Sequence, residues 1–290
     1  MPAVMWNAET MFVLSYIQAK ALLGAGREGK EKATTSLDLN LSQVEVTLTP
    51  EGVVLPDAPA LGWREVEKIA RDENTSYMFE DGTMSKIQQF SAQLNRLYSL
   101  KPTEKAPTLL ISGIPMHRIK GIDPHEDTLR KIAALAPVYG RVLDTTTGLG
   151  YTAIEAAKTP SSVLTIELDP TVLEIARSNP WSRDLFESPK ITQQVGNSAE
   201  VVSTLDAQSF DFVFHDPPTV SLGGELYSEE FYRALFRVLK RGGKLFHYVG
   251  NLESKAGSTV ARGAMRRLQE AGFVRVSRRD EAFGLIAQRP

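Results

Sequence analysis

The sequence predicts an α/β protein in which a doubly wound, mostly parallel sheet follows a smaller β-rich module. Strand-like and helix-like segments alternate from residue 121 onward, which is typical of a parallel sheet with helices on both faces. A glycine turn joins one of these strands to a helix. Residues 34–55 instead alternate apolar and polar positions, as antiparallel strands do. We therefore expect two domains, residues 1–120 and 121–290.

The first domain is expected to be β-rich with one or two helices. Leu37, Leu39 and Leu41 share one face of an expected strand, and the alternation continues to Leu48 before a turn at 50–52. This pattern predicts strands joined as a hairpin. Further expected segments are a helix at 63–71, strands at 76–79 and 108–114, and a polar loop at 101–107.

The second domain shows a regular alternation of elements. A helix is expected at 123–135, with Pro124 in its first turn. The expected strands are 141–144, 163–167, 191–195, 210–215 and 244–249. The expected helices are 151–158, 170–177, 199–205, 228–239 and 261–270. Ligands of such sheets bind beyond the carboxyl ends of the strands.

Composition excludes several classes of function. Cysteine is absent, which excludes disulfides, cysteine-bound zinc or iron–sulfur centres and a thiolate nucleophile, and the 4 histidines predict no metal site. The net charge of -2 excludes a uniformly basic surface. No run of about 18 apolar residues occurs, so no membrane span is expected. Residues 11–23 contain Gln18 and Lys20 and are a poor signal peptide, so we expect a cytoplasmic protein. Oligomeric state is left open.

The glycine turn at 142–150 is the first candidate ligand site. It contains Asp144, Gly148 and Gly150, and glycines there permit close approach of a ligand. The next strand ends at Glu167, whose carboxylate can accept hydrogen bonds from ribose hydroxyls. Three interpretations remain: an ordinary tight turn, a dinucleotide site of the G-x-G-x-x-A type, and a site for S-adenosyl-L-methionine.

This pattern resembles the class I methyltransferases, which have a Rossmann-like fold and use S-adenosyl-L-methionine. The resemblance implies that the turn wraps the methionine part of the cofactor and that the later acid holds the ribose. Thr146 stands where that family usually has its first glycine, and Asn197 replaces an acid that contacts the adenine amine. The implied cofactor-binding residues are Asp144, Thr146, Gly148, Gly150, Glu167, Asn197 and Ser198.

The second candidate site is the turn after the strand 210–215. Its residues Asp216, Pro217 and Pro218 follow His215, and the prolines remove two N–H donors from the backbone. The remaining acceptors suit an exocyclic NH2 group, and holding both N–H bonds would aim the nitrogen lone pair at a sulfonium methyl group. The candidate catalytic residues are therefore Asp216, Pro217, Pro218 and His215, although a structural role is the simpler interpretation of His215.

The turn resembles the Asp/Asn/Ser-Pro-Pro-aromatic motif of methyltransferases that act on amines of adenine, guanine or cytosine. Thr219 occupies the aromatic position, so Tyr227, Phe246 or Tyr248 would have to stack on the base. Without cysteine, methylation of pyrimidine C5 by a thiolate is excluded, and so is radical transfer through a cysteine-bound cluster, which leaves transfer to nitrogen or oxygen.

Two further interpretations stay open. Residues 226–232 and 239–243 resemble spermidine synthases, aminopropyltransferases that use decarboxylated S-adenosylmethionine and also have a β-rich N-terminal module. Their Asp-Ser-x-Asp turn and Gly-Gly-Gly-Asp-Gly loop are both missing here, which favours methyl transfer. A non-catalytic RNA-binding factor with an old cofactor fold is the other alternative.

Most of the chain is similar to a group of archaeal methyltransferases with a spermidine-synthase-like build. The similar segments are 116–121, 144–153, 215–218, 226–232 and 246–248. Membership implies a cytidine N4-methyltransferase of small-subunit ribosomal RNA that adds one or two methyl groups. Residues 255–290 contain eight basic and three acidic residues, an excess of five that favours RNA as partner. The candidate substrate-binding residues are His117, Arg118, Lys120, Thr219, Tyr227, Tyr248, Arg262 and Arg266.

Overall fold

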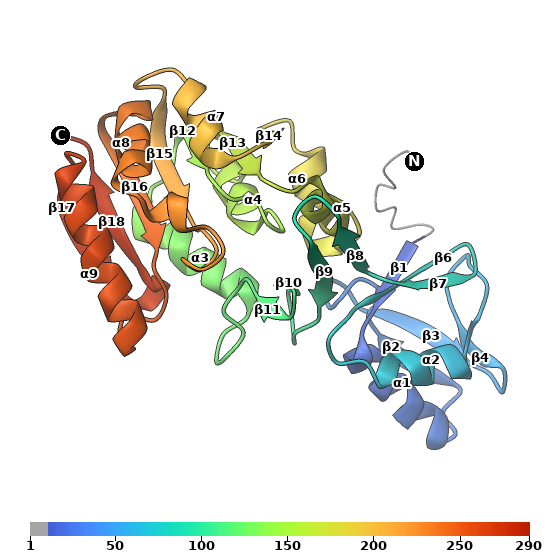
Figure 1. Cartoon of the computed structure of the whole chain (residues 1–290). Helices are drawn as coiled ribbons and strands as arrows, with labels where there is room; N and C mark the ends of the chain where they lie inside the picture. Colours follow the sequence, from blue (N-terminus) through green and yellow to red (C-terminus); the bar gives the residue numbers. More distant parts are fainter. Residues whose placement is uncertain (1–10) are drawn as a thin grey trace. The chain divides into compact units, whose positions relative to one another are not determined.

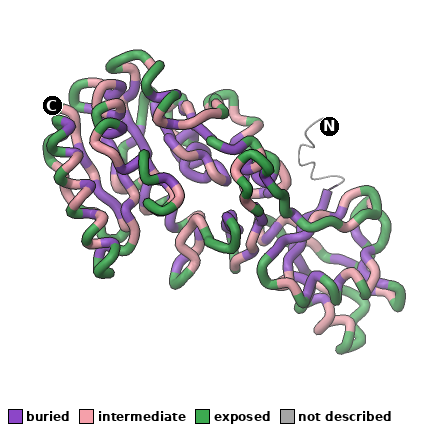
Figure 2. Tube along the Cα trace, viewed as in Figure 1, coloured by how far each residue is buried: buried purple, intermediate pink, exposed green. Residues whose placement is uncertain are grey.

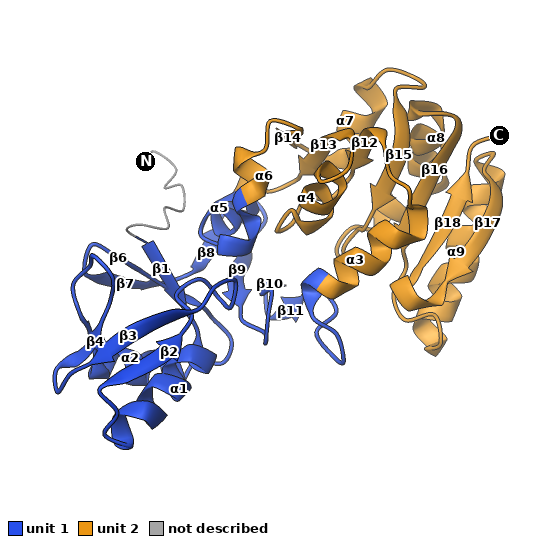
Figure 3. Ribbon diagram, turned by 180° about the vertical axis from the view of Figure 1, so that it is seen from behind, with its two compact units in different colours: residues 1–125, 171–183 blue, residues 126–170, 184–290 orange. Residues whose placement is uncertain are grey.

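The computed structural model describes residues 11–290, which divide into two compact units (Figure 3). Of the described residues, the first unit contains 11–125 together with 171–183, and the second contains 126–170 and 184–290. The sequence placed the boundary after residue 120 and assigned everything beyond it to the second domain. Residues 171–183 group with the first unit because their side chains form hydrogen bonds with residues of that unit. Trp181 donates from Nε1 to the Leu39 carbonyl at 2.9 Å, and Gln89 donates to Glu174.

The first unit contains three antiparallel sheets and helices around its own core. The first sheet consists of β1 (Met11–Leu14), β6 (Tyr77–Glu80) and β7 (Thr83–Lys86). The second consists of β2 (Lys32–Thr35), β3 (Val44–Leu48), β4 (Gly52–Val54) and β5 (Leu61–Gly62). The third consists, in spatial order, of β11 (Ile114–Pro115), β10 (Thr108–Ile111), β9 (Arg96–Lys101) and β8 (Gln88–Ser91). Its helices are α1 (Tyr16–Arg27), α2 (Trp63–Ala70) and α5 (Pro170–Arg177), followed by the short η1 (Pro180–Ser182). Helix α1 begins at a capping box in which the Ser15 and Gln18 side chains bond the opposite backbone N–H groups.

Most of the expected elements of this unit are confirmed, and the strand at 37–41 is wrong. That segment is a loop in which Leu39 and Asn40 have positive φ. The Ser36 hydroxyl accepts the Asn40 N–H at 2.7 Å, and Asp38 accepts the Ser42 N–H at 2.9 Å. These side-chain bonds replace strand pairing, which the alternation of leucines does not reveal.

The second unit is built on one seven-stranded sheet of order β14-β13-β12-β15-β16-β18-β17 (Figure 1). The strands are β12 (Gly140–Asp144), β13 (Ser161–Glu167), β14 (Ile191–Val195), β15 (Phe210–His215), β16 (Leu239–Tyr248), β17 (Val274–Arg279) and β18 (Gly284–Gln288). The first five are parallel, whereas β18 is antiparallel to both of its neighbours. This confirms the predicted α/β class and its mostly parallel sheet. The strand order reverses between β12 and β15, which is where such sheets bind ligands.

Helices bury both faces of this sheet. They are α3 (Pro124–Leu135), α4 (Tyr151–Ala157), α6 (Arg183–Glu187), α7 (Ser198–Thr204), η2 (Gly224–Tyr227), α8 (Glu229–Val238) and α9 (Lys255–Glu270), and η3 (Asp280–Ala282) joins the last two strands. Helices α7, α8 and α9 share one core with Leu143, Val213 and Leu245 of the sheet. The alternate residues Val142 and Phe214 are also buried, so the central strands are covered on both faces. Buried segments run through this unit in Figure 2. Within residues 11–290, no helix combines the length and apolar character needed to cross a membrane.

Candidate active site

The candidate site lies at the carboxyl ends of adjacent parallel strands in the second unit. Asp144 ends β12, Glu167 ends β13 and His215 ends β15, and the 216–219 turn follows directly. Because β12 pairs with both β13 and β15, their carboxyl ends lie side by side. The fold therefore brings the two motifs found in the sequence to one edge of the sheet.

The two glycines of the cofactor turn serve different purposes. Gly148 has φ 53° and nothing within 4 Å of the position a Cβ would occupy, so one side of the turn is open. Its N–H donates to Glu167 Oε2 at 2.9 Å. Gly150 has φ 79°, and a Cβ there would lie 2.6 Å from a Leu185 methyl carbon. Gly148 thus leaves room for a ligand, whereas Gly150 allows α4 to begin against α6.

Two buried carboxyl groups flank this turn. Asp144 Oδ2 accepts from Thr165 Oγ1 at 2.7 Å, while its buried Oδ1 has no hydrogen-bond partner within residues 11–290. Glu167 accepts the backbone N–H groups of Gly148 and Asp169. Burial raises the pKa of both carboxyls to about 7. An unsatisfied acceptor, a second carboxylate and an open glycine fit a nucleoside cofactor with amine and hydroxyl donors.

The next two predicted cofactor residues support the backbone here. Asn197 Oδ1 accepts the Ala199 N–H at 2.8 Å and caps α7. The buried Ser198 hydroxyl donates to the Thr145 carbonyl and so supports the cofactor turn. Thr146, which replaces a glycine of the resembled family, donates from Oγ1 to the Asp216 carbonyl at 2.8 Å. The cofactor turn and the Asp-Pro-Pro turn are therefore directly hydrogen-bonded.

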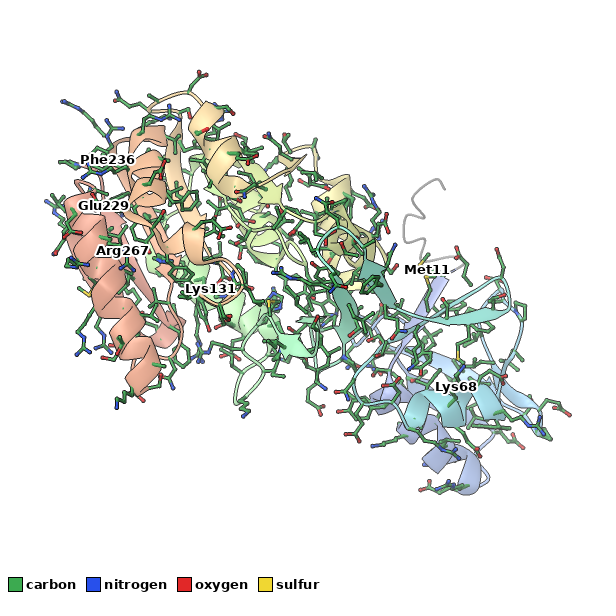
Figure 4. All side chains as sticks on the ribbon, viewed as in Figure 1. Met11, Lys68, Lys131, Glu229, Phe236 and Arg267 are labelled. Carbon is green, nitrogen blue, oxygen red and sulfur yellow. The ribbon has the colours of Figure 1, made fainter. Side chains whose placement is uncertain are left out.

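An ion pair that sequence reasoning missed holds the Asp216 carboxylate. Lys131 lies on α3, where Figure 4 labels it. Its Nζ lies 2.5 Å from Asp216 Oδ2 and 2.9 Å from Asp127 Oδ2, and the lysine side chain is 2% exposed. Its ammonium also lies 4.7 Å from the centroid of the Tyr248 ring. Burial raises the pKa of Asp216 and outweighs the opposing effect of Lys131. Burial alone would lower the pKa of Lys131, but Asp216 and Asp127 hold it above its ordinary value.

The prolines present one free and one occupied carbonyl. The Pro218 carbonyl accepts the Tyr227 hydroxyl at 3.0 Å, whereas the Pro217 carbonyl has no hydrogen bond to any described residue. Tyr227 and Phe246 are buried, so Tyr248 is the half-buried member of the three rings considered for stacking. Thr219 is exposed, with its hydroxyl 3.0 Å from that of Ser221.

His215 has a structural place in this arrangement. It is fully buried, with Nδ1 2.7 Å from Thr145 Oγ1 and Nε2 2.9 Å from the Leu226 carbonyl. Burial lowers its pKa to about 3, so the ring is neutral. Because both nitrogens are engaged, His215 ties the cofactor turn to η2, and the geometry gives it no atom for a proton from substrate.

The remaining candidate substrate residues belong to other segments of the chain. His117, Arg118 and Lys120 follow β11 in the first unit, where His117 Nδ1 lies 3.0 Å from Thr108 Oγ1. Arg262 and Arg266 are exposed on α9, and Arg266 pairs with Glu270 at 3.3 Å. Their contact with a substrate stays a prediction.

Fold and site together define an α/β protein with a candidate ligand site at the carboxyl ends of a mostly parallel sheet. Residues 119–260 match the spermine/spermidine synthase domain. Protein MJ1233 of Methanocaldococcus jannaschii, which is described as uncharacterized, is 42% identical over 292 residues, covering 97% of each chain. The chain belongs to the same family as MJ1233.

A solved structure shares this fold. A spermidine synthase in complex with the transition state analogue AdoDATO is 21% identical, with 70% of this chain and 73% of that chain covered and a TM-score of 0.56. The predicted spermidine-synthase-like build is confirmed, whereas the ribosomal RNA target stays a prediction.

Proposed function

We propose that this protein is an S-adenosylmethionine-dependent methyltransferase acting on an exocyclic amine of an RNA base, with cytidine N4 of small-subunit ribosomal RNA as the favoured target. The observation that supports it is a pair of free acceptors on the Asp-Pro-Pro turn. The Pro217 carbonyl and Asp216 Oδ1 have no hydrogen bond to described residues, and Thr146 ties this turn to the cofactor turn. An NH2 group needs two acceptors next to a methyl donor.

The residues present fit the cofactor, and separate groups of residues would bind the cofactor and the target amine. Asp144, Glu167 and the open edge at Gly148 would hold it. When bound, it supplies a methyl group activated by a sulfonium sulfur. Asp216 Oδ1 and the Pro217 carbonyl accept the two N–H bonds of the target amine and so direct its lone pair. As the nitrogen–carbon bond forms, the bond between the methyl carbon and the sulfonium sulfur would break and leave its electron pair on sulfur. Asp216 or water then takes the proton that leaves the nitrogen.

Base and RNA recognition are assigned to other parts of the chain. Tyr248 is half-buried and close to Lys131, so its ring provides the stacking surface that Thr219 lacks. The basic residues of the last segment and those after β11 provide phosphate contacts, in keeping with the excess of five basic residues in 255–290.

Modified-nucleoside mapping by mass spectrometry tests the target. Ribosomal RNA from a strain lacking the gene should lose a methylated cytidine, and purified protein with S-adenosylmethionine should restore it. Unchanged methylcytidine in the deletion strain would exclude this target.

Aminopropyl transfer is a second candidate because residues 119–260 match the spermine/spermidine synthase domain. The protein would then convert putrescine with decarboxylated S-adenosylmethionine, and RNA would have no effect on turnover. Formation of spermidine in that assay, with no methyl transfer to RNA, would establish this alternative.

A further inference from the structure

A lysine fully enclosed beside the substrate turn needs a functional explanation. Lys131 contacts two carboxylates, Asp127 one helical turn earlier and Asp216 on the substrate turn. It also lies over the face of Tyr248 at the end of β16. Removing an ammonium from water is unfavourable, and an apolar side chain would cover the same surface at no such cost. Stability alone therefore does not account for a lysine at this position.

The ion pair changes which ligand the turn can accept. Asp216 Oδ2 is occupied by Lys131 at 2.5 Å, which leaves Oδ1 as the atom that meets an amine. An amine hydrogen-bonded to Oδ1 would stand within about 7 Å of Nζ, where like charges repel in a partly buried site. A neutral NH2 group meets no such repulsion and gains an acceptor polarised by the adjacent cation.

The structure assigns to Lys131 the role of a specificity-determining residue that makes the site accept an uncharged amine and exclude an ammonium group. This inference rests on the proposed function for the identity of the amine, an aromatic exocyclic NH2. It also separates this site from one that binds polyamines, because polyamines are cations that need unpaired carboxylates. Lys131 acts through Asp216 and is a positioning residue, with no contact to the reacting atoms required.

Other charged groups near Asp216 do not cancel the preference for an uncharged amine that Lys131 imposes. Asp127 adds a negative charge, but its carboxylate is fully buried and already lies 2.9 Å from the same ammonium. Asp144 and Tyr227 also interact electrostatically with Asp216. Burial raises the pKa of Tyr227, so its hydroxyl stays neutral. Burial raises the pKa of Asp144 to about 7, so at pH 8.5 this carboxyl is ionised and adds a negative charge that the substitutions at Lys131 do not remove. The cation that faces the Asp216 carboxylate at bonding distance is Lys131.

The test measures polyamine binding and needs neither RNA nor methyl transfer. Full-length wild type, Lys131→Met and Lys131→Arg are each saturated with S-adenosylhomocysteine and titrated calorimetrically with spermidine at pH 8.5. Lys131→Met should bind spermidine at least about tenfold more tightly than wild type, because one positive charge beside Asp216 is lost. Lys131→Arg should behave as wild type. Arg130→Met is the matched control, because it removes a charge from an exposed pair with Glu126 on the same helix.

A second variant keeps the test decisive if Lys131→Met misfolds. Lys131→Met leaves two buried carboxylates without a cation, so Asp127→Asn with Lys131→Met removes one charge of each sign and should show the same gain in spermidine affinity. Unchanged spermidine affinity in a folded, nucleoside-binding variant would overturn the inference. Equal gains in Lys131→Arg and Lys131→Met, or tight spermidine binding by wild type, would overturn it as well. An unchanged methylcytidine level in ribosomal RNA of the deletion strain would instead count against the proposed function alone.

Discussion

The protonation of Asp144 should control the affinity for S-adenosylmethionine. This carboxyl has one hydrogen bond, from Thr165, and one buried oxygen without a partner among the described residues. Its pKa is raised to about 7 by burial, so at pH 6 about nine in ten molecules hold a proton there. A cationic ligand with amine and hydroxyl donors needs the ionised acceptor. Cofactor affinity should therefore rise with pH.

The size of the effect follows from these values. For one carboxyl with a pKa of about 7, affinity should fall about tenfold between pH 8 and pH 6. The pKa of Glu167 is also raised to about 7, so the fall in affinity approaches a hundredfold if both carboxyls must ionise.

The raised pKa of Asp144 also affects stability, because the ligand-free fold holds the Asp144 proton more tightly than the unfolded chain does. Its ionisation should thus destabilise the ligand-free protein progressively from pH 4 to pH 7, by about 4 kcal/mol at most.

Isothermal titration calorimetry at pH 6, 7 and 8, in two buffers of different ionisation enthalpy, measures both affinity and proton release. Asp144→Asn should reduce the change in cofactor affinity between pH 8 and pH 6 by about tenfold. It should also remove the proton release that accompanies cofactor binding at this carboxyl. Asp211→Asn is the control, because Asp211 lies at the opposite edge of the sheet and bonds the Arg141 N–H and Lys240. Affinity independent of pH, or a full slope retained in Asp144→Asn, would refute the reasoning.

Three further outcomes are expected. Asp216→Ala should lower turnover by about a hundredfold or more while leaving cofactor affinity within about threefold of wild type, and a parallel loss of cofactor binding in calorimetry would show that the residue is misplaced. Gly150→Ala should lower the free energy of unfolding in denaturant titration by about 1–3 kcal/mol, because its Cβ would lie 2.6 Å from Leu185; an unchanged midpoint would contradict this packing. Tyr232→Phe should lower the free energy of unfolding by about 1–3 kcal/mol, because the substitution removes a buried hydroxyl that lies 2.8 Å from His247 Nε2. Thermal stability equal to wild type would argue against that hydrogen bond.

Local patterns in the sequence were enough to predict the sheet and the cofactor turn. Parallel strands place their carboxyl ends at one edge, so Asp144, Gly148 and Glu167 come together once the alternation of elements is recognised. Both glycines in the motif have positive φ, as the spacing implies. Strand β17 was missed because Val274–Arg279 is polar and half-exposed, without the apolar run of a buried strand.

Long-range partners could not be read from the chain. Lys131 and Asp216 are 85 residues apart, and their pairing depends on which face of α3 meets the substrate turn. The one available sign was a charged i,i+4 pair, Asp127 and Lys131, aligned with the buried Leu135, and that spacing is far more common on solvated helices. The same limit applies to His215, whose chemistry depends on burial and on partners from two other segments.

The return of residues 171–183 to the first unit has a practical consequence for dissecting the protein. A fragment that begins at residue 121 would include α5 and Trp181 but would lack the strand and loop that bond them. Such a fragment would expose an indole and an amphipathic helix to solvent, inviting aggregation. Loss of RNA binding after that truncation would then report a damaged fold, so the first unit is better studied by surface substitutions in the intact chain.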